Sequence, residues 1–181
     1  MRLLFLLLIT LIIGSCDLPS GPDKDHPLYV PDPNRLYFLN TRQLDYTKVM
    51  EDEDSGIRVY LAEGIDGKDS PLGAYIIDYW IDGRAGLILR FSSDKNPKTI
   101  EELLEPGTTL NFNWAEASQS LIFNTDLISN AKLAEELFQI TIAEKELHII
   151  NQSGKSMSIS RVQDSYLKLR VVLNDYLKLI N

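Results

Sequence analysis

The stretch YIIDYWIDGRAGLILRF, residues 75–91, decides the fold class of this chain. Apolar residues recur with a period of two on both sides of Asp82-Gly83, as they do in half-buried antiparallel strands. Asp-Gly between two such segments is also among the strongest local signals for a tight turn. The stretch therefore predicts a β-hairpin.

The register of this hairpin depends on the length of its loop. A two-residue loop would bury the Asp78 carboxylate without an evident partner, which is costly. We therefore expect a three-residue loop, residues 81–83, with Gly83 in the left-handed conformation. In that register Asp78 and Arg90 share one face, and the apolar face holds Tyr75, Ile77, Tyr79, Ala85, Leu87, Leu89 and Phe91.

Similar alternation predicts further strands. A three-residue loop at residues 152–154 would align Leu147 and Ile149 with Met157 and Ile159. A strand at residues 138–142 would complete a three-stranded meander with one apolar face. Other candidate strands lie at residues 35–40, 57–61, 110–114 and 121–123.

Helices are predicted at fewer places. Pro97 begins a short helix that continues to about residue 105, and residues 126–137 are either a helix or a loop. Asp164 can cap a C-terminal amphipathic helix. Its apolar residues recur at spacings of three and four: Tyr166, Leu169, Leu173, Tyr176 and Ile180.

These elements predict a mainly β protein of the α+β class, with about eight or nine antiparallel strands. We expect one domain over residues 35–181. It is either a meander sheet or a small barrel, and the C-terminal helix packs on the sheet or closes one end. The architecture is similar to that of lipocalin-like and other small envelope β-proteins.

Composition excludes several kinds of site. The chain has 181 residues, one cysteine, two histidines and a net charge of −8. It therefore has neither an internal disulfide framework nor a cysteine-based zinc site, and its acidic charge argues against a nucleic-acid partner. His26 and His148 have no neighbouring metal ligands at a recognised spacing. We predict no metal, no cofactor and no catalytic residue, with a hydrolase that uses paired carboxylates as the enzymatic alternative.

The first sixteen residues have the three regions of a secretory signal. Met1-Arg2 is a basic start, and residues 3–13 form an apolar run that is too short to span a bilayer. Ile13-Gly14-Ser15-Cys16 resembles the lipobox of bacterial lipoproteins, in which the chain is cleaved before the cysteine and the cysteine is acylated. The resemblance implies a signal peptide at residues 1–15 and a lipid anchor on Cys16. The alternatives are a plain secretion signal and a buried N-terminal helix.

The next segment, residues 16–34, is predicted to be a tether between the lipid and the domain. It contains five of the eight prolines, which favour an extended and semi-rigid chain. Removal of the signal peptide would take away Arg2 and no acidic residue, so the mature net charge would be −9. Asp17 directly after the cysteine resembles an inner-membrane retention signal of enterobacterial lipoproteins. In other Gram-negative groups acidic residues here resemble a surface-export signal. We expect a membrane-anchored protein of the cell envelope on the periplasmic or surface face, and favour the outer membrane in a Gram-negative cell.

Two sets of residues are candidates for binding. Trp and Arg are frequent in interface hot spots, so a partner surface is predicted at Asp78, Trp80, Arg84 and Arg90, unless this is an ordinary exposed face. Aromatic residues at strand spacing predict either core packing or a ligand cavity lined by Tyr75, Tyr79, Phe112 and Trp114. The acidic run at residues 51–54 predicts a solvated loop or a weak divalent-cation site.

The leading functional hypothesis is a non-catalytic, lipid-anchored protein that binds a protein partner, as an accessory subunit or an immunity-type inhibitor. Its acidic charge would suit a basic partner. The alternative is a lipocalin-like carrier of a small apolar ligand or a sugar.

Overall fold

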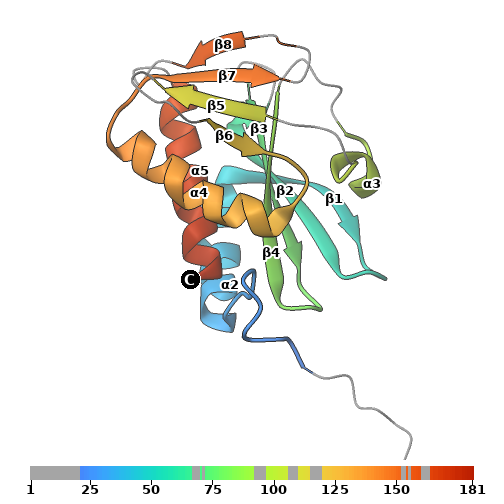
Figure 1. Cartoon of the computed structure of the whole chain (residues 1–181). Helices are drawn as coiled ribbons and strands as arrows, with labels where there is room; N and C mark the ends of the chain where they lie inside the picture. The colour runs from blue at the N-terminus through green and yellow to red at the C-terminus, as the bar shows by residue number, and fades with distance from the viewer. Residues whose placement is uncertain are drawn as a thin grey trace, which may run out of the picture.

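The computed structural model describes residues 21–66, 70, 72–91, 97–105, 110–114, 120–151, 154, 156–159 and 164–181. Their strands form two four-stranded antiparallel sheets (Figure 1). The first sheet has the order β1-β2-β3-β4 and consists of β1 Tyr46–Asp52, β2 Ile57–Asp66, β3 Leu72–Tyr79 and β4 Arg84–Phe91. The second has the order β6-β5-β7-β8 and consists of β5 Leu110–Trp114, β6 Leu121–Phe123, β7 Leu147–Asn151 and β8 Ser156–Ile159. The predicted mainly β architecture is confirmed, and among the described residues the strands form two open sheets instead of a closed barrel.

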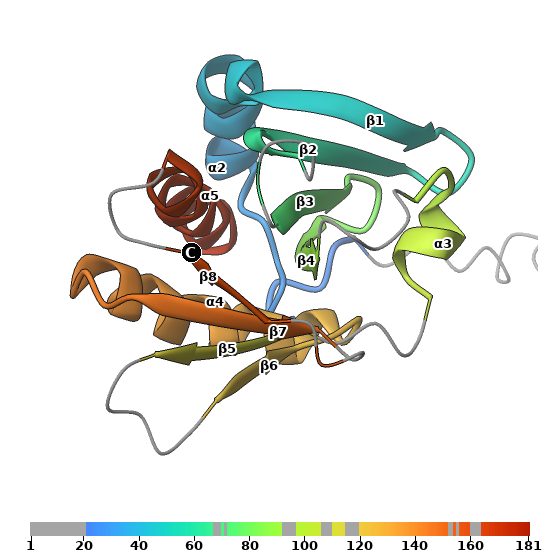
Figure 2. The same ribbon diagram turned by 90° about the horizontal axis from the view of Figure 1, so that it is seen from above.

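Two long helices connect the sheets into one core. α4 Leu127–Ile142 and α5 Asp164–Ile180 pack against each other. α5 contacts the first sheet, and α4 contacts both β4 and β6. Figure 2 shows the second sheet lying across α4, with α5 beside the first sheet. One hydrophobic cluster therefore contains apolar side chains from both sheets and both helices.

Short helices complete the fold. α2 Asp32–Tyr37, the π-helix η1 Phe38–Arg42 and the 3₁₀-helix η2 Gln43–Asp45 lead into β1. α3 Ile100–Leu103 covers the opposite face of the first sheet, where Leu103 is buried with Val59, Tyr75, Ile77 and Ile88. Both faces of this sheet are therefore covered. No helix in the described part of the chain is long and apolar enough to cross a membrane.

The predicted register of the β3–β4 hairpin is wrong. Tyr79 pairs with Arg84 and Asp78 pairs with Ala85, so the loop has four residues, 80–83. Gly83 does adopt the left-handed conformation, with φ of +67°. In the observed register the Asp78 side chain lies on the core face of the hairpin. The prediction had placed only apolar residues on that face. The observed register is possible because Arg35 provides the ionic partner that the local sequence does not contain.

Two predicted strands are helical in the structure. Residues 138–142 are the last part of α4. That helix begins after Asp126, which caps it by accepting hydrogen bonds from the N–H groups of Ile128 and Ser129. Residues 35–40 belong to α2 and η1, which begin after Pro31. Phe38 is buried there against the rings of Tyr46 and Tyr60.

The remaining pairings that lie on described residues are confirmed. Leu147 pairs with Ile159 and Ile149 pairs with Met157, as the predicted loop length requires. β5 pairs with β6, the strand at residues 57–61 is part of β2, and the C-terminal helix spans residues 164–180. The helix predicted after Pro97 is shorter than expected and begins at Ile100, after Thr99, whose hydroxyl caps it by accepting a hydrogen bond from the N–H of Glu102. β1 was not predicted.

Candidate functional site

The candidate site lies where the described chain begins, at the end of the first sheet formed by its hairpin loops. We call this region the hairpin end and define it as residues 21–37 together with loops 53–56 and 80–83. The N–H of Val30 donates to the carbonyl of Gly83 at 2.8 Å, and the N–H of Ala85 donates to the carbonyl of Leu28 at 3.0 Å. These bonds hold the N-terminal segment against the start of β4.

The folded part begins before residue 35. Leu28 is 4% exposed and Val30 is 1% exposed, so both side chains are part of the packed domain. Tyr29 forms an isolated antiparallel bridge with Arg84. Most of the described segment before α2 is therefore attached to the domain, and little of the predicted tether remains between it and Cys16.

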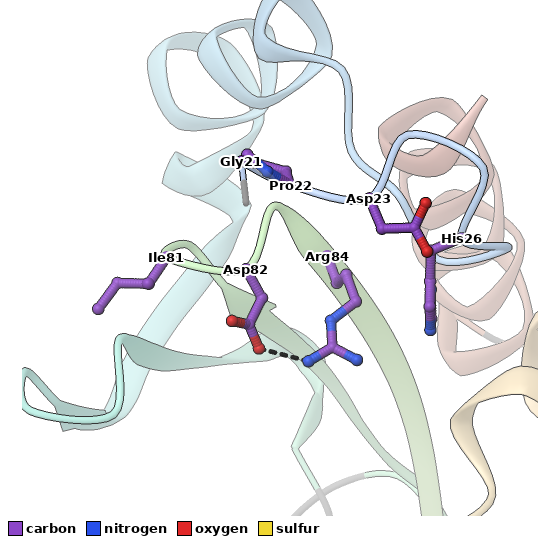
Figure 3. A pocket seen from close by; sticks show the side chains of 7 residues that line it. All are labelled: Gly21, Pro22, Asp23, His26, Ile81, Asp82 and Arg84. Carbon is purple, nitrogen blue, oxygen red and sulfur yellow. Dashed lines mark hydrogen bonds and ion pairs between the residues drawn. The ribbon is translucent and has the colours of Figure 1, made fainter. Parts of the chain in front are cut away.

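A pocket of about 580 Å³ opens between this segment and the β3–β4 loop. It is lined by Gly21, Pro22, Asp23, His26, Ile81, Asp82 and Arg84 (Figure 3). Its polar groups already have intramolecular partners. Arg84 is paired with Asp82, and Nδ1 of His26 accepts the N–H of Leu28 at 3.1 Å. The pocket is a hollow beside a loop whose charges are locally neutralised.

Arginine and aromatic side chains meet on both sides of the loop. The guanidinium of Arg58 lies 5.2 Å from the ring centroid of Trp80, and that of Arg84 lies 5.7 Å from the ring centroid of Tyr79. Trp80 is 36% exposed and Ile81 is 52% exposed. The loop therefore presents an aromatic and an aliphatic side chain to the outside, flanked by two cations.

A buried ion pair underlies this surface. Asp78 is 3% exposed, and its Oδ1 lies 3.0 Å from Nη2 of Arg35 and accepts a hydrogen bond from Nε at 3.1 Å. Burial raises the pKa of Asp78, and the nearby Arg35 opposes that rise. The pair joins α2 to β3 and so fixes the N-terminal helix on the sheet.

The residues predicted as one partner surface are separated in the structure. Asp78 is buried on the core side, so its expected exposure is wrong. Trp80 and Arg84 lie at the hairpin end, whereas Arg90 lies six residues further along β4 and donates to the carbonyl of Glu102 at 2.9 Å. At about 3.3 Å per residue, Arg84 and Arg90 are roughly 20 Å apart along the strand. Only Trp80 and Arg84 remain together.

The residues predicted as one ligand cavity belong to two clusters. Tyr75 and Tyr79 pack with the residues under α3, while Phe112 and Trp114 pack in the main core. Phe112 is fully buried and its ring contacts that of Phe123 at 5.4 Å. These four side chains are packing residues on different faces.

The acidic run at residues 51–54 spans the end of β1 and the start of the β1–β2 turn. Oδ1 of Asp52 accepts the N–H groups of Asp54 and Ser55, and hydrogen bonds from Ser55 lower the Asp52 pKa. Glu51 is paired with Lys48 and with Arg58. Within the described ranges no group of three or more His, Cys, Asp or Glu side chains is placed to hold a metal ion.

Two features of the site were missed in the sequence. The attachment of residues 28–30 was hidden by the surrounding prolines, although Leu-Tyr-Val is an apolar run that can signal such packing. Arg35 as the partner of Asp78 has no local signal, because the two residues are 43 positions apart.

No protein-family model, curated protein or solved structure matches this chain.

Attachment of the N-terminal segment can be tested at Gly83. A Cβ at this position would lie 2.7 Å from Cβ of Pro22, in addition to the cost of about 1–2 kcal/mol for a left-handed L-residue. We expect Gly83→Ala to destabilise the domain more than Gly154→Ala and to speed hydrogen exchange at the N–H groups of Val30 and Ala85. Gly154 is the matched control because it also has positive φ but no atom within 4 Å of the added Cβ. Equal losses and unchanged exchange would contradict the attachment.

Proposed function

We propose that this chain is a lipid-anchored protein of the cell envelope that acts by binding a protein partner and not by catalysis. The observation that carries the proposal is the position of the single cysteine, which directly follows Ile13-Gly14-Ser15 after the basic start and the apolar run. Each acyl chain contributes about 0.8 kcal/mol per buried methylene, so two or more chains hold a protein stably at a membrane.

The buried acidic groups favour binding over catalysis. The described part of the chain buries two carboxylates: Asp78, which is paired with Arg35, and Asp175, which is paired with Arg42. Acid–base catalysis needs a carboxyl group that can exchange a proton with a substrate. Both carboxylates instead join a helix of the N-terminal region to the rest of the domain.

Partner binding needs a surface directed away from the anchor, and the open face of the second sheet supplies one. Figure 1 shows this sheet at the opposite end of the molecule from α2 and the N-terminal segment. The side chains of Asn111, Asn113, Ile122, His148 and Ile150 are half-buried or exposed, whereas those of Leu110, Phe112, Leu121 and Phe123 are buried. The alternative of a lipocalin-like carrier is less favoured because its four candidate residues lie in two separate clusters.

Replacement of Cys16 tests the anchor in cells. We expect wild-type protein to sediment with the membrane fraction and to incorporate a labelled fatty acid. We expect Cys16→Ser to lose the label, because acylation needs the thiol. Ser15→Ala is the control, since it changes a neighbouring residue and leaves both a small residue and the thiol in place. Equal labelling of wild type and Cys16→Ser would contradict the proposal.

Partner binding is tested by in-cell photo-crosslinking from Ile122, which is exposed on the second sheet. We expect a discrete adduct that disappears when Asn113→Arg alters the same face. Val171 on α5 is an exposed control position away from that sheet. The same crosslinked products from Ile122 and from Val171 would argue against a specific partner on this face.

A further inference from the structure

We propose that the hairpin end lies against the bilayer that carries Cys16, with Trp80 and Ile81 in the headgroup layer. This inference rests on the proposed function, because it requires an acyl anchor on Cys16. Trp80 and Arg84 of the candidate site would then lie against a zwitterionic lipid bilayer.

The length of the connector limits how the anchored domain can be oriented. Five residue steps lead from Cys16 to Gly21, and a fully extended chain covers at most about 3.6 Å per residue, or roughly 18 Å. A domain of this size has a radius of gyration of about 15 Å, so its full breadth exceeds that reach. The side of the domain on which Gly21 lies must therefore face the membrane.

The structure places Gly21 at the hairpin end. Gly21 and Pro22 line the same pocket as Ile81 and Arg84 (Figure 3). Pro22 also lies so close to the loop that a Cβ added at Gly83 would be 2.7 Å from its Cβ. In Figure 1 the N-terminal segment, α2 and the tip of the β3–β4 hairpin lie at one end, and the second sheet lies at the other. A short anchor at Gly21 brings the first of these ends to the lipid.

This end exposes side chains suited to a lipid headgroup layer. Trp80 and Ile81 project from the loop, and Leu36 and Tyr37 on α2 are 59% and 50% exposed. Trp and Tyr have an apolar body and a polar tip, which suits the boundary between water and hydrocarbon. The guanidinium of Arg58 stacks on Trp80 and is paired with Glu51, so it holds the ring of Trp80 at this end.

Charge at the same end selects the kind of lipid. Acidic side chains are frequent in residues 21–37 and in the β1–β2 turn, and they include Asp23, Asp25, Asp32, Glu53 and Asp54. An anionic bilayer would repel them, whereas a zwitterionic bilayer imposes no such penalty. Contact is therefore expected without anionic lipid, driven by the anchor and by the apolar side chains.

The two tryptophans provide a direct test, because Trp80 lies at the hairpin end and Trp114 lies in β5 of the second sheet. The lipidated protein is reconstituted in phosphatidylcholine vesicles that contain a lipid with a nitroxide quencher near its headgroup. Trp114→Phe leaves Trp80 as the only tryptophan, Trp80→Phe leaves Trp114, and excitation at the red edge of the absorption band avoids the tyrosines. We expect loss of emission from Trp80 and no loss from Trp114. Equal quenching of the two, or quenching of Trp114 alone, would overturn the orientation.

A charge substitution checks that the loop itself makes the contact. Ile81→Asp should reduce the quenching of Trp80, because it places a carboxylate in the headgroup layer. Ile122→Asp is the matched control, since Ile122 is similarly exposed but lies on the second sheet. Quenching of Trp80 that is unaffected by Ile81→Asp would overturn the assignment of this loop.

Chemical coupling separates this inference from the lipidation proposal. Cys16 is the only thiol in the chain, so the mature protein can be attached through it to a maleimide lipid in the same vesicles. Selective quenching of Trp80 in the coupled protein supports the orientation whether or not cells acylate Cys16. Absence of that selectivity overturns the orientation even where acylation in cells is demonstrated.

Discussion

Replacement of Arg42 by alanine is expected to lower the free energy of unfolding by about 3–5 kcal/mol. Nε and Nη2 of Arg42 donate to the two carboxylate oxygens of Asp175 at 3.0 and 2.9 Å, and the Tyr46 hydroxyl donates to Oδ2 at 2.9 Å. Asp175 is buried in α5, so removal of the guanidinium leaves a desolvated charge whose remaining partner among the described residues is Tyr46. Burial, followed by the nearby Asp175 charge, raises the pKa of Tyr46 above its ordinary value of 10, so this hydroxyl is protonated and can donate at neutral pH.

Urea unfolding of chains that all carry Cys16→Ser measures this loss. Tyr46→Phe removes one hydrogen bond and should cost about 1–2 kcal/mol. Lys48→Ala breaks an exposed ion pair with Glu51 and should cost less than about 1 kcal/mol. An Arg42→Ala protein as stable as the Lys48→Ala protein would show that the Asp175 network does not hold η1 on α5.

Replacement of Arg35 by leucine is expected to cost about 3 kcal/mol at neutral pH, and much of that loss should be recovered in acid. The change leaves the buried Asp78 carboxylate without its cation. Burial already raises the pKa of Asp78 above its ordinary value of 3.8, and loss of Arg35 should raise it further. Because the folded protein then binds this proton more tightly than the unfolded chain, Asp78 stabilises the fold most below pH 3.8. That contribution is lost as the pH rises through the raised pKa.

The pH dependence separates this charge effect from a simple loss of packing. Unfolding free energies of wild type, Arg35→Leu and the double variant Arg35→Leu/Asp78→Asn are compared from neutral pH down toward pH 4. The difference between wild type and Arg35→Leu should shrink as the pH falls, and the double variant should show no such dependence on Asp78. A loss in Arg35→Leu that is constant over this range would rule out an uncompensated Asp78 carboxylate as its cause.

Local patterns of apolar residues predicted those parts of the fold in which segments adjacent in sequence pair with each other. The β7–β8 register depends on a short loop and on the alternation of Leu147 and Ile149, so it could be read from about a dozen residues. The C-terminal helix is similarly determined by the spacing of its own apolar residues. The same reasoning predicted the wrong β3–β4 register, because Arg35, a residue distant in sequence, offsets the cost of burying Asp78.

The candidate site was less predictable than the fold because tertiary contacts assemble it. Trp80 and Arg84 were identified from their type and remain together at the hairpin end. The segment at residues 28–30 was expected to be tether, yet it is bonded to Gly83 and Ala85. The strand expected at residues 138–142 is helical because the Asp126 cap starts a helix that continues through Thr141, which is buried. Alternation over five residues does not distinguish a strand from the end of such a helix.

The mass of the N-terminal peptide shows whether the mature protein begins at an acylated Cys16. Protein is purified with detergent from the cells that make it and is digested before mass spectrometry. We expect a first peptide that starts at Cys16 and carries the added mass of a lipid on the cysteine. A first peptide that starts at Met1, or that contains Cys16 with an unmodified thiol, would rule out the lipid anchor.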